Sequence, residues 1–271
     1  METRTSDGIR LYWEQSGAGQ PLLLIQGLGW SADMWYRMVP RLEASHRVIR
    51  YDARGVGRSD VPDGPYPVEV MGADAVSVLD AAGVDRAHVF ACSLGGLVAL
   101  ELGLSHPERV TSLTLCCTHP GGTDTVLPDP EVLQLLMSRS EMPFEQTVRA
   151  AVHVAYAPDT DQEIIEEDIR RRLAVPTAAE GYRAQLLGGS AYAGAGSRLS
   201  GIDVPTLVIT GDADQLVPLA NSELLASRIP RARLVTIPGA GHVVFNERTD
   251  ELCAELSSFL AEVDAGASTP G

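Results

Sequence analysis

Ala91-Cys92-Ser93-Leu94-Gly95-Gly96 is the stretch that decides the fold of this chain. An apolar run, residues 86–90, precedes it, and a helical pattern, residues 97–102, follows it. We therefore predict a short buried strand that turns sharply into a helix at Ser93. Such a turn exposes the serine hydroxyl at a helix N-terminus, where partial positive charge stabilises a developing anion. The pattern is G-x-S-x-G, with Ala91 in place of the first glycine.

The composition indicates one acidic globular core. The chain has 271 residues, 45% of them hydrophobic, which suffices for a single large core. A net charge of -15 argues against nucleic acid or an anionic membrane as a partner. Lysine is absent, which excludes Schiff-base chemistry. The four cysteines lack CxxC spacing, which predicts reduced thiols and suits the cytoplasm. The N-terminus has no apolar leader, so we expect no signal peptide. No apolar run approaches ~20 residues, so we expect no membrane span.

Strand and helix patterns alternate through residue 118. Residues 2–15 predict a hairpin, and later apolar runs predict buried strands at 21–25, 47–51, 86–92 and 110–117. Helices are predicted between them at 31–42, 68–82 and 94–105. The alternation resumes with strands at 206–210 and 233–237 and helices at 219–227 and 247–263. Continuously apolar strands are typical of a mainly parallel sheet with helices on both faces, so we predict an α/β fold.

Residues 119–198 interrupt this alternation and contain no strand pattern. Helical patterns occur at 130–138, 143–156, 161–174 and 177–187, and a Gly/Ala-rich stretch, 188–196, predicts a flexible return. The charged run 161–172 is interpreted as a solvated helix face. We therefore predict a core formed by residues 1–118 and 199–264, a helical lid at 119–198, and a disordered tail at 265–271.

A serine hydroxyl needs a base to become nucleophilic, and the base needs an orienting acid. Functional groups in parallel sheets collect at the carboxyl ends of the strands. Asp212 and Asp214 follow the strand that ends at Thr210, and His242 follows the strand that ends at Ile237. The order serine, acid, histidine is that of one hydrolase fold. We predict Ser93 as nucleophile and His242 as general base, with either aspartate as the acid.

Five motifs in this order resemble those of the α/β-hydrolase family, over about residues 5–264. They are Gly27-Leu28-Gly29, Asp52-Ala53-Arg54-Gly55-Val56-Gly57-Arg58-Ser59, Cys92-Ser93-Leu94-Gly95-Gly96, Gly211-Asp212-Ala213-Asp214-Gln215-Leu216-Val217-Pro218 and Gly239-Ala240-Gly241-His242. The resemblance implies an eight-stranded, mainly parallel sheet with a helical lid between the sixth and seventh strands. Residues 50–118 are most similar to 3-oxoadipate enol-lactonases and related esterases.

The resemblance also assigns roles around Ser93. It places the acid three residues after Gly211, which selects Asp214 and leaves Asp212 to hydrogen-bond the turn. It implies that the backbone N–H groups of Leu28 and Leu94 form the oxyanion hole. Many relatives have histidine at the position of Gln26. We expect the substrate pocket under the lid to include Gln26, Trp30, His119, Met142 and Tyr156.

Together these patterns favour a serine hydrolase that cleaves a carboxylic ester or lactone without a cofactor or metal. The sequence leaves open a carbon-carbon bond hydrolase, or a biosynthetic acyltransferase or cyclase, built on the same three residues. A ligand-binding homologue without catalytic activity is the third alternative. The expected partner is a small molecule, and the oligomeric state is left open, a homodimer being one alternative.

Overall fold

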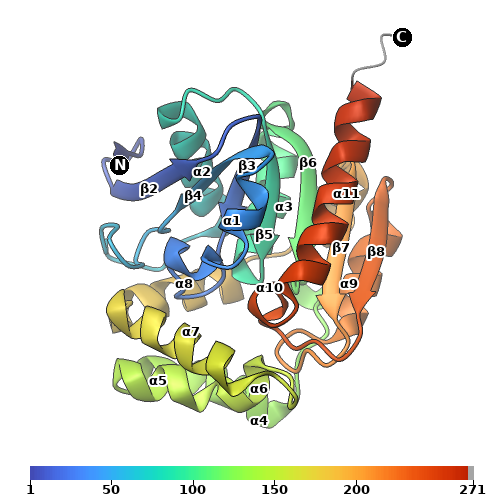
Figure 1. Ribbon diagram of the computed structural model, residues 1–271. Coiled ribbons are helices and arrows are strands. Elements are labelled where there is room, and N and C mark those ends of the chain that lie inside the picture. The colour runs from blue at the N-terminus through green and yellow to red at the C-terminus, as the bar shows by residue number, and fades with distance from the viewer. Residues whose placement is uncertain (268–271) are drawn as a thin grey trace.

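An eight-stranded sheet forms the centre of the protein. The computed structural model describes residues 1–267, without the side chains of Ser140 and Ala267. The strand order is β1-β2-β4-β3-β5-β6-β7-β8 (Figure 1). The strands are β1 (Glu2–Arg4), β2 (Arg10–Ser16), β3 (Gln20–Ile25), β4 (His46–Tyr51), β5 (Ala87–Cys92), β6 (Val110–Cys116), β7 (Thr206–Gly211) and β8 (Ala232–Ile237). β1 and β2 pair antiparallel, as do β2 and β4, and the remaining pairs are parallel, so the predicted sheet is confirmed.

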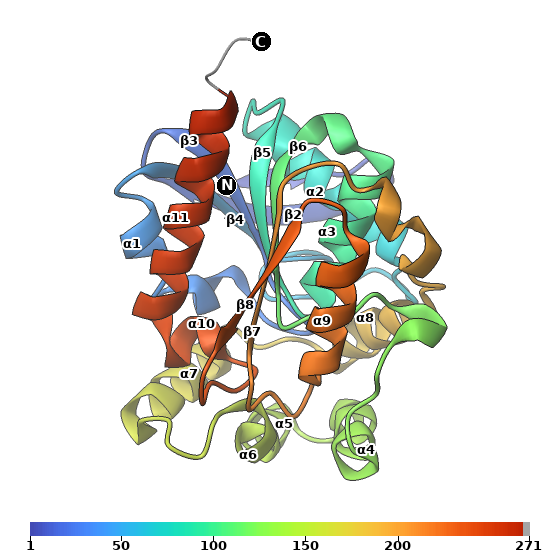
Figure 2. The same cartoon turned by 90° about the vertical axis from the view of Figure 1, so that its right-hand side faces the viewer.

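Helices cover both faces of the sheet because its central strands are apolar on both sides (Figure 2). One face packs against α2 (Val68–Ala81), α3 (Leu94–Ser105) and α9 (Leu219–Arg228). The other face packs against α1 (Val39–Leu42), α10 (Val244–Glu247) and α11 (Thr249–Ala267). Along β5 the side chains alternate between the two cores, with Val89 and Ala91 in the first and Phe90 and Cys92 in the second.

The chain between β6 and β7 is helical throughout its regular elements. It contains α4 (Pro130–Ser138), α5 (Phe144–Ala150), α6 (Val152–Ala155), α7 (Gln162–Ala174) and α8 (Ala179–Ala191), together with the short 3-10 turns η3 (Gly122–Asp124), η4 (Arg139–Glu141) and η5 (Gly196–Gly201). Figure 1 shows α4, α5, α6 and α7 gathered beyond one end of the strands. This arrangement agrees with a lid at residues 119–198, and we keep that domain boundary as a proposal.

Two predicted helices are broken into shorter pieces. The expected helix at 31–42 is a 3-10 turn, η1 (Ala32–Trp35), followed by α1, and the Ser31 side chain makes no capping bond. The carboxylate of Asp52 takes its place, because its Oδ1 accepts the N–H of Ala32 at 2.8 Å. The expected helix at 143–156 is divided into α5 and α6 at Ala151.

Two helix boundaries and the exposure of one segment differ from the prediction. α8 continues through Gly188 and Gly189, where we expected a flexible return. A Cβ on Gly188 would lie 1.7 Å from the backbone oxygen of Tyr66, so glycine is required for this helix to approach the core. α11 extends to Ala267, so residues 265–267 are helical rather than part of a tail, and residues 268–271 lie outside the described chain. The run 161–172 is only partly solvated, because Asp168 and Arg172 are buried.

Candidate active site

Ser93 occupies the turn between β5 and α3. Its φ of 55° and ψ of -122° lie in a region that non-glycine residues rarely adopt, at a cost of about 1–3 kcal/mol. Three bonds hold the turn: the Ser93 N–H donates to the Cys116 carbonyl at 2.9 Å, the Gly96 N–H to the Ser93 carbonyl at 2.8 Å, and the Thr118 hydroxyl to the same carbonyl at 2.7 Å. The backbone geometry therefore presents the Ser93 side chain away from the sheet, at the start of α3.

The loop after β3 lies against this turn. A Cβ on Gly27 would be 3.0 Å from the Ser93 Cβ, and a Cβ on Gly95 would be 2.6 Å from the backbone oxygens of Ile25 and Gln26. The two segments therefore approach more closely than larger residues allow. Within the described chain, the backbone N–H groups of Leu28 and Leu94 have no hydrogen-bond partner. Both are free to bind an oxyanion, as the prediction requires.

Gln26 and Gln185 fix the shape of this loop. The Gln26 Oε1 accepts the Gly27 N–H at 2.9 Å. Gln185, on α8, accepts the Gly29 N–H at 2.9 Å through Oε1 and donates Nε2 to the Arg54 carbonyl at 3.1 Å. The helical insertion thus contacts the loop that carries Leu28 directly. Sequence reasoning missed Gln185, because nothing in the local pattern of α8 shows which residue faces the loop.

His242 and Asp214 form a buried pair. The His242 Nδ1 lies 2.8 Å from the Asp214 Oδ2, and the Asp214 Oδ1 accepts the N–H groups of Leu216 and Val217 at 2.8 and 2.9 Å. Burial opposes protonation of His242, but the negative charge of Asp214 outweighs it and raises the histidine pKa above its ordinary value. Asp212 instead accepts the Gly239 N–H at 2.6 Å, as expected for a turn residue.

The loop that carries His242 is anchored by Glu247, which the sequence did not single out. The Glu247 Oε2 accepts the N–H groups of Gly241 and Ala157 at 3.1 and 3.0 Å and the Thr160 hydroxyl at 2.9 Å. It therefore ties the histidine loop to the turn between α6 and α7. The spacing Gly241 to Glu247 gives no signal of this contact, which depends on the insertion folding back over α10.

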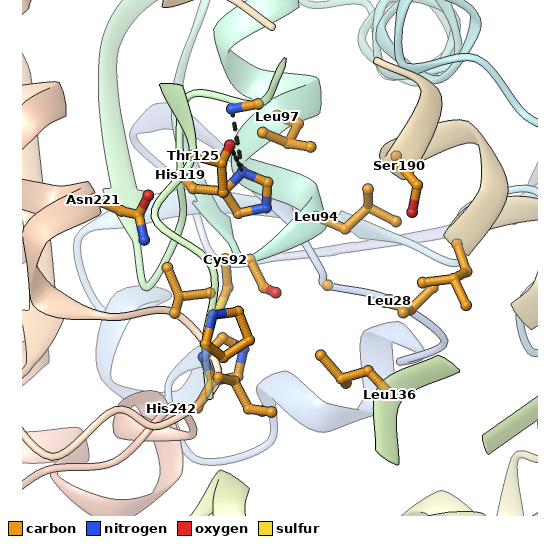
Figure 3. A pocket seen from close by; sticks show the side chains of 18 of the residues that line it. Leu28, Cys92, Leu94, Leu97, His119, Thr125, Leu136, Ser190, Asn221 and His242 are labelled. Carbon is orange, nitrogen blue, oxygen red and sulfur yellow. Dashed lines mark hydrogen bonds between the residues drawn. The ribbon is translucent and has the colours of Figure 1, made fainter. Parts of the chain in front are cut away.

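One mostly apolar cavity of about 720 Å³ connects these groups. It is lined by Ser93, His242, Leu28 and Leu94, so both parts of the predicted machinery face the same space. Figure 3 shows His242, Leu28 and Leu94 around it. Loop 123–128, α4, η4 and α8 form its opposite wall. The enclosure is typical of small-molecule sites, which are concave and carry few polar groups.

The five residues expected in the pocket divide into two groups. Gln26, Trp30 and His119 line the cavity. Met142 and Tyr156 are not among its lining residues, which corrects the prediction. Tyr156 is buried in the core on the α11 face, where its hydroxyl donates to Asp168 at 2.8 Å. Met142 follows η4 and is only half-buried.

His119 is a neutral donor that faces the cavity (Figure 3). Burial, helped by the positive charge of His242, lowers its pKa to about 4. Its Nδ1 accepts the Gly121 N–H at 3.1 Å and lies 3.2 Å from the Thr125 hydroxyl. Because Nδ1 is an acceptor, the single ring proton of the neutral form resides on Nε2. His119 can therefore donate one hydrogen bond from Nε2.

Three potential metal ligands come together at the site. The ligand atoms of Cys117, Asp214 and His242 lie within 4.8 Å of one another, the single such group found within residues 1–267. Both Asp214 oxygens are already engaged, one by His242 and the other by two backbone N–H groups. The donor set fits an oriented histidine better than a metal site, whose ligands require lone pairs directed at the ion.

The alpha/beta hydrolase fold family matches residues 20–249. The chain belongs to this family. This α/β hydrolase is 36% identical over 256 residues to the "Putative carbamate hydrolase RutD" of Azorhizobium caulinodans, covering 91% of this chain and 96% of that one. It is 34% identical to rhodomycin D methylesterase DnrP of Streptomyces peucetius, covering 90% and 93%. The enol-lactonase of Burkholderia xenovorans LB400 superposes with a TM-score of 0.86 at 26% identity, covering 96% and 100%.

The α/β hydrolase thus has homologues that are named for the hydrolysis of different bonds, and the fold alone does not select among them. Across residues 1–267, none of the helices combines the length and apolar character needed to cross a membrane. The resemblance inferred from the five motifs is confirmed by the family match, which spans all of them from Gly27 to His242.

Proposed function

We propose that this α/β hydrolase cleaves a carboxylic ester or lactone through an acyl-enzyme on Ser93. The observation that carries the proposal is the convergence on one cavity of a serine in a strained strand-to-helix turn, a histidine paired with a buried aspartate, and two unpartnered backbone N–H groups. Each part supplies something that acyl transfer requires: a nucleophile, a base and an oxyanion site.

In the proposed reaction the Ser93 Oγ attacks the substrate carbonyl carbon while His242 accepts the hydroxyl proton on Nε2. The N–H groups of Leu28 and Leu94 bind the oxyanion of the tetrahedral intermediate. Collapse breaks the carbonyl carbon–oxygen bond, and His242 returns the proton to the leaving alcohol. Water, deprotonated by His242, then cleaves the acyl-enzyme, and Ser93 recovers its proton. Asp214 stabilises the imidazolium that forms in both halves of the reaction.

The neutral His119 supports a carbonyl-containing substrate rather than a purely apolar one. Its Nε2 proton is a hydrogen-bond donor in a wall that is otherwise largely apolar. A polar oxygen on the substrate would pair with it, and an apolar ligand would leave it unsatisfied at a cost of about 1–3 kcal/mol. His119 is therefore proposed to orient the substrate, not to transfer protons.

Two experiments test the proposal. Ser93→Ala is expected to abolish turnover of p-nitrophenyl butyrate, and the wild type is expected to react covalently with a fluorophosphonate probe. Full activity of Ser93→Ala would exclude Ser93 as nucleophile. An unreactive serine in a folded wild-type protein would favour the ligand-binding alternative. Labelling of Ser93 without hydrolysis of any ester in a chain-length panel would favour a carbon-carbon hydrolase or an acyltransferase.

A further inference from the structure

Two arginines of the helical insertion are buried without an acidic partner. Arg139, the first residue of η4, is 5% exposed, and Arg172, in the last turn of α7, is 6% exposed. Within residues 1–267 neither guanidinium forms a hydrogen bond or an ion pair. The Nε atoms of both, and Nη2 of Arg139, are buried with no partner. Burial of an unpaired charge destabilises a protein by several kcal/mol. A bound anion would pair with these two guanidinium groups, and the protein itself does not supply one.

Arg54 shows how the same chain treats a buried arginine elsewhere. It is also 5% exposed, but its Nε and Nη2 donate to the two oxygens of Asp74 at 2.6 and 2.7 Å. This two-bond pair satisfies both groups, as is usual for buried guanidinium groups. The lack of a carboxylate beside Arg139 and Arg172 is therefore specific to their location.

The nearest acidic candidate, Asp168, is already occupied. It lies one helical turn before Arg172 on α7 and is fully buried. Its carboxylate accepts the hydroxyls of Tyr36 and Tyr156 at 2.9 and 2.8 Å and the amide of Asn246 at 2.9 Å. Three neutral donors thus satisfy Asp168, and it forms no ion pair with Arg172.

Both arginines lie at the cavity that Ser93 lines, one directly and the other through Trp30. Arg139 lines it directly. The Arg172 guanidinium lies 4.4 Å from the ring centroid of Trp30, which lines the same cavity. Burial, together with the positive charge of Arg139, lowers the pKa of Arg172 to about 9. The two guanidinium groups therefore repel each other electrostatically. Aromatic contacts, including Tyr182 at 5.3 Å from Arg139, offset part of the charge but accept no N–H bonds in the guanidinium plane.

We propose that Arg139, together with Arg172, is an anion subsite, and that the substrate carries a carboxylate which Arg139 binds. The proposal rests on the proposed function, because this carboxylate belongs to the ester or lactone cleaved at Ser93. A guanidinium fork matches a carboxylate with two parallel N–H bonds. The apolar wall between the two sites then contacts a hydrocarbon spacer, which makes the substrate a monoester or lactone of a dicarboxylic acid.

Mono-p-nitrophenyl esters of the C4 to C8 dicarboxylic acids test this subsite, each paired with its methyl-capped neutral analogue. For at least one chain length we expect the wild-type kcat/KM for the acid to exceed that for the neutral ester by about tenfold or more. In Arg139→Gln the acid-to-neutral ratio should fall by about ten- to hundredfold. Arg170→Gln, an equal change of charge at an exposed residue of α7, should leave the ratio within about twofold.

Binding to Ser93→Ala provides a second readout that needs no turnover. Calorimetric titration should give tighter binding of the acid than of its neutral analogue, and adding Arg139→Gln should remove the difference. If the wild-type ratio of kcat/KM for the acid to that for the neutral ester is near or below one at every chain length, the subsite is overturned. This outcome holds even if Arg139→Gln does not fold. Failure of fluorophosphonate labelling would instead overturn the serine mechanism, and a retained preference of Ser93→Ala for the acid would leave the subsite standing.

Discussion

Asp214→Asn is the most informative single substitution in this site, because the neighbouring hydrogen bonds determine the orientation of the new side-chain amide. The Asp214 Oδ1 accepts two backbone N–H groups, from Leu216 and Val217, and only an oxygen can do so. An asparagine therefore keeps its oxygen there and turns its NH2 toward the His242 Nδ1, 2.8 Å away in the wild type. Nδ1 must then accept, which places the ring proton on Nε2, where His242 can no longer take the Ser93 proton.

We expect this change of tautomer to lower kcat by about 10⁴-fold, the magnitude known for the equivalent change in another serine hydrolase. His242 acts when neutral, so kcat/KM rises as pH rises through its pKa. Asp214 raises that pKa, and removing the charge lets burial lower it. The acidic limb of the pH profile should therefore move to lower pH in the residual activity of Asp214→Asn.

The assay is hydrolysis of p-nitrophenyl butyrate between pH 5 and 9, and Asp212→Asn is the matched control. Within residues 1–267 the Asp212 carboxylate bonds only the turn N–H of Gly239, so its variant should retain activity within about threefold. A loss of kcat of less than tenfold in Asp214→Asn, or an acidic limb displaced to higher pH, would show that Asp214 does not set the tautomer and pKa of His242. Equal losses in both aspartate variants would show that the effect is not specific to the pair with His242.

Three further predictions concern residues around the site and in the core. His119→Phe should raise KM for esters about fivefold or more with an unchanged pH profile above pH 5, because His119 is already neutral there; a shifted limb would indicate proton transfer by His119. Glu247→Ala should lower the free energy of unfolding in urea by about 2–3 kcal/mol and reduce kcat, since its Oε2 holds the Gly241 loop; unchanged kcat would remove its positioning role. Asp74→Ala should lower the free energy of unfolding by about 3–5 kcal/mol, because Arg54 loses its buried partner and keeps only the half-exposed Asp7. Arg54→Met with Asp74→Leu should recover most of this loss; no recovery would contradict the buried-charge argument.

The residues around Ser93 were predictable because their signals are local. A serine between a buried strand and a helix, followed by two glycines, specifies a turn whose geometry hardly depends on the rest of the chain. His242 and the two candidate acids, Asp212 and Asp214, could be placed because they follow strands of the same sheet, and parallel strands bring their carboxyl ends to one edge. The family resemblance then selected Asp214. Continuously apolar segments predicted the parallel strands, and the family resemblance implied the eight-stranded sheet.

The cavity wall was not predictable, because it depends on how the helical insertion packs. Arg172 belongs to the segment 161–172, whose eight charged residues are typical of a solvated face, yet it is buried against Trp30. Met142 and Tyr156 were expected in the pocket from residue type alone, which does not give their direction. Arg139 did leave one signal: no acidic residue lies three or four positions away from it, so no helical ion pair can neutralise it.

Covalent catalysis at Ser93 can be tested by trapping the acyl-enzyme. We would react the wild type and His242→Ala with p-nitrophenyl butyrate, quench with acid, and locate the butyryl group by peptide mass spectrometry. We expect one butyryl group on Ser93, which persists longer in His242→Ala because deacylation lacks its base. Turnover with the acyl group on neighbouring Cys92, or with no acylated peptide under conditions that trap a known serine esterase, would contradict covalent catalysis at Ser93.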